Sequence, residues 1–306
     1  MCAYAMGRIE STPKRIIFIV VWSLIVVFVM ITADDIKPYL SNRTPRMMQN
    51  SADLYSHSSS WMGNTWITKG GRLYTPEQVH FAFANTTGCI LFVGDSLGRR
   101  LSGALGTVLQ TNITNTRDVD LATLKSNISP QYHGPHKWPF DHDKYCVHFH
   151  WSPKIEVLEK MVYELYEHDR FHYTAVVIAV GTHDVSSHAK RIDNSISMTQ
   201  LYAANITSII DGFTKRLSPV IWRTAPHSRR SDGFNHELSM FNTIASNICL
   251  SHPSHSCVVM DAETLMKNRS VGEHRIAGDS EYHFGEDGVM AMLQYLLFIL
   301  FGTPSE

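Results

Sequence analysis

Short apolar runs and amphipathic stretches alternate along the chain from about residue 66 onward. Apolar runs bounded by turn residues predict buried strands. The predicted strands span residues 89–94, 145–151, 174–181, 218–224 and 256–261. Between them, apolar residues recur at three- and four-residue steps, as in IEVLEKMVYELY, which predicts helices with one buried face. The predicted helices span residues 96–110, 152–169, 197–217, 235–250 and 286–302. This alternation is typical of a three-layer α/β/α sandwich around a mostly parallel five-stranded sheet, in which ligands bind at the carboxyl ends of the strands.

The longest apolar run lies outside this pattern, near the start of the chain. Residues 16–33 contain only Ser23 and Thr32 as polar interruptions, and a run of this length is just long enough to cross a bilayer as a helix. Basic residues precede the run and two aspartates follow it, so the positive-inside rule predicts a cytosolic tail at residues 1–15. A cleaved signal peptide is the competing interpretation, but the run exceeds the usual ~7–15 residues of such a segment.

The sequence after this predicted anchor divides into two parts. Residues 34–65 are polar, rich in Ser and Asn, and without a sustained period, which predicts a lumenal stem. Residues 66–306 then form the folded domain, and 306 residues with 44% hydrophobic and 18% charged side chains suffice for one domain plus appendages. The formal net charge of -1 gives no overall field that recruits nucleic acid, so no nucleic-acid partner is expected.

Sequons and cysteines agree with a lumenal domain. Asn-x-Ser/Thr sequons all follow the apolar run, at Asn42, Asn85, Asn112, Asn127, Asn205 and Asn268. Beyond Cys2, the cysteines form an even set that suits an oxidising compartment. We expect Cys249 to pair with Cys257 across a short loop, and Cys89 with Cys146 because both lie on strands of one sheet. Four buried free thiols are the alternative.

Reactive side chains follow the predicted strands where those strands end. The first strand ends in Gly94-Asp95-Ser96, the third in GTHD, which contains His183, and the fourth in RTAPHS, which begins with Arg223. The segment GDSEYHFGEDG precedes the last predicted helix. Because the carboxyl ends of parallel strands meet at one edge, these segments are expected to converge there.

The residue types in these segments suit nucleophilic acyl transfer. A serine hydroxyl needs a base to take its proton, and a carboxylate to orient that base. Ser96, His283 and Asp279 supply these three roles. The oxyanion formed on attack needs preorganised donors, which the backbone N–H of Ser96, the His183 side chain and Gly134 can provide. Arg99 and Arg223 are candidate contacts to the substrate. Arg99 and Arg100 at the mouth are candidates to contact an acidic sugar or the phosphates of an acyl donor, and the alternative is that one of these two packs over the first helix as a structural cation.

Several segments in the same order resemble a known family. RLYTPEQVHFAFANTTGCILFVGDSLGRRL resembles the first block of the PC-esterase branch of the SGNH/GDSL superfamily, in which Gly-Asp-Ser-x-x-Arg follows a strand. CVHFHWSP, VVIAVGTHD, IWRTAPHS and HFGEDGVMAMLQYLL resemble the later blocks. The resemblance covers residues 70–302 and implies an SGNH or flavodoxin-like fold with acyl transfer or deacylation on glycan hydroxyls. Arg99 stands at the position of the family's arginine.

Two departures from the family pattern bear on the site. The third block usually offers Gly-x-Asn, whereas this chain has His183 in place of the amide. The family's Asp-x-x-His becomes Asp279-Ser-Glu-Tyr-His283, which is one residue longer. Either the loop bulges so that Asp279 still orients His283, or the enzyme works with a Ser-His dyad. A third interpretation makes Asp287–Met290 the remnant of an Asp-Gly-Val-His motif, which leaves no catalytic histidine.

The sequence therefore predicts a membrane-anchored serine O-acyltransferase or esterase that acts on glycans. A catalytically inactive member of the same fold that binds a glycan or a protein is the alternative. No cofactor is expected besides an acyl donor such as acetyl-CoA if the reaction is transfer. The predicted location is a Golgi or other secretory-pathway membrane, in type II orientation. The histidines around His148 and His150 make a zinc or copper site conceivable, but no tight ligand signature supports one, and no metal is expected.

Overall fold

The computed structural model describes most of the predicted domain. The described residues are 47–50, 52–53, 59–62, 65–68, 72–86, 88–110, 136–140, 145–168, 173–188, 195–215, 219–228, 230–267 and 284–302. No helix within these ranges is long and apolar enough to span a membrane. The predicted anchor, residues 16–33, lies outside them, as do Gly134, Asp279 and His283.

A six-stranded sheet forms the centre of the domain, in the order β4-β5-β3-β6-β7-β8. Five of its strands are parallel: β3 (Gly88–Gly94), β5 (Tyr145–Trp151), β6 (Tyr173–Ala179), β7 (Val220–Arg223) and β8 (Cys257–Met260). These are the five strands that the apolar runs predict. β4 (His136–Phe140) was not predicted and pairs antiparallel with β5 at the edge. It contains Pro139, and edge strands are where a sheet tolerates proline.

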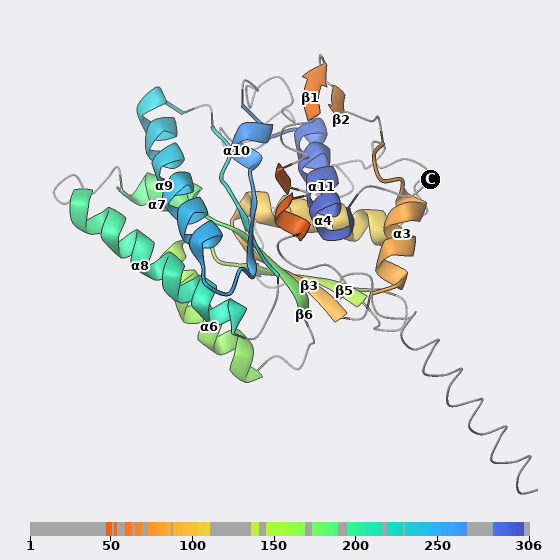
Figure 1. Ribbon diagram of the computed structural model, residues 1–306, viewed down its shortest axis with the longest axis horizontal. Helices are drawn as coiled ribbons and strands as arrows, with labels where there is room; N and C mark the ends of the chain where they lie inside the picture. Colours follow the sequence, from red (N-terminus) through yellow and green to blue (C-terminus); the bar gives the residue numbers. More distant parts are fainter. Residues whose placement is uncertain are drawn as a thin grey trace, which may run out of the picture. The chain divides into compact units, whose positions relative to one another are not determined.

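Helices cover both faces of the sheet, as the predicted sandwich requires (Figure 1). The helices on one face are α3 (Pro76–Ala84), α4 (Ser96–Gln110) and α11 (Glu286–Phe301). The helices on the other are α6 (Ile155–His168), α8 (Ser195–Thr214) and α9 (Asp232–Ser251). The remaining elements are the short helices α7 (Thr182–His188) and α10 (Ala262–Leu265) and a hairpin of β1 (Ser59–Met62) and β2 (Thr65–Thr68).

The central strand shows why these sequences form buried strands. In β3, Phe92 packs into the core that includes α4 and α11, whereas Leu91 and Val93 pack into the core that includes α6 and α8. All three side chains are at most 1% exposed. A strand covered on both faces must be apolar at successive positions, which accounts for the continuous run CILFV.

The folded domain begins earlier than the sequence predicts. Residues 47–50 and 52–53, which lie in the predicted stem, are helical. Met48 and Ala52 are four residues apart, share one face, and are 0% and 1% exposed within the core that contains α11. Gln49 adds a polar tie, because its Oε1 accepts a hydrogen bond of 2.8 Å from the backbone N–H of Val259 in β8. The stem therefore cannot extend unbroken to residue 65.

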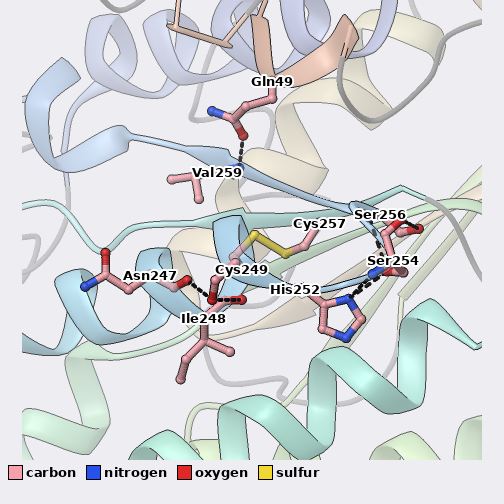
Figure 2. Close-up of a disulfide and its surroundings, with 10 residues drawn as sticks. Gln49, Asn247, Ile248, Cys249, His252, Ser254, Ser256, Cys257 and Val259 are labelled. Atoms are coloured by element: carbon pink, nitrogen blue, oxygen red, sulfur yellow. Dashed lines mark hydrogen bonds between the residues drawn. A yellow bond between two sulfur atoms is a disulfide. The ribbon is translucent and has the colours of Figure 1, made fainter.

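Both predicted disulfides are present, and both lie toward the amino ends of strands. Cys89 and Cys146 are register partners on β3 and β5, with their Cα atoms 4.4 Å apart. The pair of Cys249 and Cys257 joins the last turn of α9 to the first residue of β8, with a Cα separation of 5.2 Å (Figure 2). Each bridge fixes the start of a core strand.

The two sequons among the described residues differ in access. Asn85 is exposed at the end of α3, and its Nδ2 donates to the carbonyl of Phe81. Asn205 lies inside α8 and is only 8% exposed. A glycan on Asn205 has no room in the folded protein, so this sequon is not an acceptor in the native state.

Candidate active site

The candidate site lies where the chain leaves two neighbouring strands in opposite directions. β3 and β6 are adjacent and parallel, but β3 leads into α4 on one face, and β6 leads through α7 into α8 on the other. Such a switch point leaves a crevice at the carboxyl ends of the two strands, which is where open α/β sheets bind ligands. Ser96 follows the end of β3, and His183 follows the end of β6.

A tight turn connects β3 to the serine. The backbone N–H of Asp95 donates to the carbonyl of Ala179 at the end of β6, at 3.0 Å. A Cβ atom at Gly94 would overlap that same carbonyl oxygen, so glycine is required where the two strand ends approach each other. Ser96 then occupies the first position of α4 and is partly exposed. The turn thus presents the hydroxyl-bearing residue at a helix N-terminus.

Asp95 caps the helix that carries Ser96. Its Oδ1 accepts from the backbone N–H groups of Leu97 at 3.0 Å and of Gly98 at 3.4 Å. A carboxylate at this position satisfies otherwise unpaired amides and complements the helix dipole. The side chain is buried. Asp95 is therefore part of the scaffold of the site and does not face substrate.

Arg223 is buried behind Asp95. The sequence predicts Arg223 as a substrate contact, but its side chain is 0% exposed, and its Nη2 lies 3.9 Å from Asp95 Oδ1. Nη1 donates to the carbonyl of Thr224, whereas Nε and Nη2 have no hydrogen-bond partner among the described residues. Burial lowers the pKa of the guanidinium, and the nearby Asp95 carboxylate opposes that shift. Contrary to the sequence prediction, Arg223 is therefore too deeply buried to contact a substrate, and it supports Asp95 instead.

Arg99, a predicted substrate contact, and His183, a predicted oxyanion donor, both contact the ring of Trp151. Arg99, one turn after the start of α4, places its Cζ 5.7 Å from the centre of the Trp151 ring. The ring of His183 meets Trp151 edge-on, with 6.2 Å between centroids. Trp151 ends β5, beside the end of β3. The structure thus brings Arg99 and His183 together at Trp151, a residue for which the sequence analysis predicts no role.

A partly buried carboxylate, Asp184, follows His183. Asp184 Oδ1 accepts a 3.0 Å hydrogen bond from the backbone N–H of Ile155, the first residue of α6. Its Oδ2 is buried without a hydrogen-bond partner in the described part of the chain. Burial raises the pKa of Asp184 to about 7; the Ile155 amide opposes the shift, and the charge of Asp95 adds to it. Burial, with a contribution from Asp184, also raises the pKa of Tyr202 well above its ordinary value.

Phe284, the residue that follows the predicted base in the sequence, contacts the helix that begins with Ser96. Phe284 is fully buried against the core of α4 and α11. Its carbonyl accepts a 3.2 Å hydrogen bond from Nη1 of Arg100, which lies about one turn beyond Ser96 on α4. Arg100 therefore ties Phe284, which begins the described segment 284–302, to the helix that begins with Ser96. Arg100 has the structural role that the sequence left open for an arginine at this mouth.

Of the two candidate metal-site histidines on β5, His148 is held by contacts within the protein. His148 is buried, with Nε2 3.2 Å from Cys146 Sγ and Nδ1 2.9 Å from the hydroxyl of Tyr173. Within the described ranges, Cys89, Cys146 and His148 are the one group with metal-ligand spacing. Both sulfurs of that group are already joined in the disulfide.

Sequence comparisons identify no relative for this chain: no family model matches it, and no curated protein matches it. Solved structures with a similar backbone do exist. One is LAE5, an α/β hydrolase from the metagenome of Lake Arreo, with 12% identity, a TM-score of 0.45, and coverage of 72% of this chain and 98% of LAE5. Another is Axe2, an acetylxylan esterase from Geobacillus stearothermophilus, with 14% identity, a TM-score of 0.42, and coverage of 70% and 94%. At these values the similarity concerns the arrangement of the backbone alone.

Proposed function

We propose that this protein is a serine esterase or O-acyltransferase of the SGNH type, related to the PC-esterase branch, with Ser96 as the nucleophile. In the first half-reaction, Ser96 Oγ forms a bond to the acyl carbonyl carbon while its proton passes to His283. The ester C–O bond then breaks, and the proton passes from His283 to the leaving hydroxyl. In the second half-reaction, water or a sugar hydroxyl gives its proton to His283 and attacks the acyl carbon. The bond from that carbon to Ser96 Oγ then breaks, Ser96 regains a proton from His283, and an acid or a new ester is released.

One observation carries this proposal. Ser96 begins α4 at the switch point of the sheet, and Arg100 on the same helix holds the carbonyl of Phe284, the residue directly after His283. The proposed nucleophile and the residue that follows the proposed base in the sequence thus both contact one helix. Asp279 is proposed to orient His283, and the oxyanion donors are proposed to be the Ser96 amide, His183 and Gly134.

The substrate and the setting of the enzyme are further parts of the proposal. We propose glycan hydroxyls as the acylated or accepting groups, with acetyl as the acyl group, because the segments shared with the PC-esterase branch imply that chemistry. A lumenal orientation behind a membrane anchor at residues 16–33, in the Golgi or a neighbouring compartment, suits a glycan-modifying enzyme. A transferase would then need an acyl donor such as acetyl-CoA on the lumenal side.

Active-site labelling tests the nucleophile directly. The full chain is incubated with a fluorophosphonate probe, and the labelled residue is identified by mass spectrometry. We expect labelling at Ser96, loss of labelling in Ser96→Ala, and strongly slowed labelling in His283→Ala. If the folded protein is not labelled at Ser96 at any pH between 5 and 9, the catalytic proposal is wrong, and the inactive binding protein becomes the better account.

A further inference from the structure

A second cluster of polar side chains lies at the carboxyl ends of β7 and β8. It consists of His227, from the segment after β7, Ser239 and Asn242, from α9, and Glu263, from α10, and is called here the His227 cluster. The other three side chains all contact the Glu263 carboxylate. Oε1 accepts from the hydroxyl of Ser239 and lies 3.0 Å from His227 Nε2, while Oε2 accepts from Asn242 Nδ2 at 2.7 Å.

The fold holds this carboxylate in place. Asn242 also binds the backbone of Ala225 in both directions, with its Oδ1 accepting and its Nδ2 donating at 2.8 Å. The backbone N–H of Glu263 donates to Thr224 Oγ1 at 2.9 Å. Glu263 is therefore tied to the strand end by its main chain and to α9 by its side chain. These contacts hold Glu263 in place without any contribution from His227.

The fixed carboxylate determines which face His227 presents. A carboxylate only accepts hydrogen bonds, so we assign the ring proton that faces Glu263 to Nε2. In the neutral ring, Nδ1 is then a hydrogen-bond acceptor, and it has no partner among the described residues. The side chain of His227 is 40% exposed, against 22% for Glu263. The cluster thus holds one oriented acceptor on a side chain that is partly exposed to solvent.

A second histidine–carboxylate pair in the same domain shows what a closed arrangement looks like. His252, after the end of α9, has Nε2 2.8 Å from Asp211 Oδ1 and Nδ1 2.6 Å from Ser254 Oγ. Its side chain is only 8% exposed. Both ring nitrogens of His252 have partners, whereas Nδ1 of His227 has none within the described ranges.

The His227 cluster lies on the same edge of the sheet as Ser96. β7 is separated from β3 only by β6, so the two strand ends are about 10 Å apart, since neighbouring strands are spaced by about 4.8 Å. Arg223, four residues before His227, reaches across to Asp95, next to Ser96. A ligand longer than one sugar ring that lies along this edge is able to reach both positions.

The chemistry of the cluster selects among ligands. The Glu263 carboxylate beside the ring disfavours an anionic ligand, and both of its oxygens already accept hydrogen bonds. The one described group with metal-ligand spacing is elsewhere, at Cys89, Cys146 and His148. We propose that the His227 cluster is a subsite for a hydroxyl group of a neutral oligosaccharide, which donates to His227 Nδ1 while a neighbouring sugar unit lies at Ser96. The reach to Ser96 rests on the proposed function; the binding of the hydroxyl does not.

Binding to an inactive protein tests the subsite without catalysis. The full-length Ser96→Ala protein is titrated with xylotetraose, cellotetraose and mannotetraose by isothermal calorimetry, alone and with His227→Ala or His252→Ala added. We expect His227→Ala to weaken the Kd of the bound sugar about tenfold, the size of one lost hydrogen bond, and His252→Ala to leave it unchanged. Absence of binding by all three sugars, or an equal Kd with and without His227, overturns the proposal.

A ratio of activities separates the subsite from the reaction itself. For the active protein, kcat/KM is measured with an acetylated tetrasaccharide and with 4-nitrophenyl acetate, which is too short to span the edge. We expect the ratio of the two values to fall about tenfold in His227→Ala and to stay constant in His252→Ala. A constant ratio in His227→Ala overturns the subsite. If neither ester is hydrolysed but His227 still governs sugar binding, the esterase proposal fails and the subsite stands.

Discussion

The two ends of the central sheet have opposite designs. Toward the amino end, one disulfide joins β3 to β5, and another joins α9 to β8. Near the second bridge, His252 uses both ring nitrogens in hydrogen bonds, and Ser254 and Ser256 bond within the same turn (Figure 2). Covalent bonds and satisfied polar groups make this end a fixed base for the strands.

The carboxyl end instead keeps buried polar atoms without partners. Thr182 Oγ1, Asp184 Oδ2 and Arg223 Nε are buried and make no hydrogen bond within the part of the chain that the structure describes. Such atoms reduce stability, and native proteins keep them mainly where function needs them. The base of the sheet is therefore built for stability, and the opposite edge carries the proposed chemistry, so variants at the two ends should have different consequences.

The largest expected effect is on activity, at the carboxyl end. Ser96→Ala and His283→Ala are each expected to lower kcat/KM for 4-nitrophenyl acetate by about 10³-fold or more, because the nucleophile or its base is lost. Ser96→Ala should leave the free energy of unfolding within about 0.5 kcal/mol, since the side chain is partly exposed. Ser102→Ala, a buried serine of the same helix, is the control that should cost about 1 kcal/mol of stability with little loss of activity.

Asp279→Asn decides how His283 is oriented. A loss of activity similar to that of His283→Ala supports a bulged loop with a complete triad. Full activity leaves a Ser-His dyad.

Disulfide removal is the matching test at the amino end. Cys89 and Cys146 are 57 residues apart, and Cys249 and Cys257 are 8 apart. Chain-entropy arguments give a loss of about 4 kcal/mol for a Cys89→Ala/Cys146→Ala variant and about 2.5 kcal/mol for Cys249→Ala/Cys257→Ala. Denaturant unfolding measures both losses. Activity per folded molecule should persist, and a folded variant that has lost activity would contradict the division between the two ends.

Arg223 is the residue whose substitution should affect both stability and activity, because it is buried beneath the candidate site. Arg223→Met leaves the buried Asp95 carboxylate without its cation, which is expected to cost about 3 kcal/mol of stability and also to lower activity. Arg230→Met, at an exposed arginine, should change stability by less than about 0.5 kcal/mol. Adding Asp95→Asn to Arg223→Met should recover part of the loss. Strictly additive effects would show that the two side chains do not interact.

The sequence predicted the core elements well because their patterns are strong. The five parallel strands are apolar runs covered on both faces, and their bounds agree with prediction to within about two residues. The weak patterns failed. Met48 and Ala52 are two apolar residues in a polar stretch, and β4 is a short edge strand interrupted by Pro139, so neither carries enough periodicity to be recognised.

For the candidate site, the sequence predicted which edge of the sheet the residues lie on, but not how deeply each side chain is buried. Ser96 and His183 both follow strands that end at the switch point, which topology alone indicates. Arg223 ends a strand in the same way, yet its side chain points into the protein, and strand position does not reveal this. Asp184 depends on a contact with Ile155 from a distant helix, which no local pattern contains.

The smallest expected effect concerns Asp184, and it distinguishes a functional residue from a structural one. Its pKa in the folded protein is about 7, above the ordinary value of 3.8, so between these values the folded state holds a proton that the unfolded state has lost. The free energy of unfolding should therefore fall as pH rises through this window and level off above about pH 7. Asp184→Asn keeps the acceptor for Ile155 and removes the titration. The rise from 3.8 to about 7 corresponds to about 4 kcal/mol, and solvent screening at this partly exposed side chain reduces the effect to about 2 kcal/mol. At pH 8 the Asp184→Asn variant is therefore expected to be more stable than the natural chain by about that amount, and near pH 4 the two should be equal. Denaturant unfolding at pH 4, 6 and 8 measures the difference. If the free energy of unfolding depends on pH in Asp184→Asn as it does in the natural chain, Asp184 is not one of the groups at the carboxyl end that reduce stability.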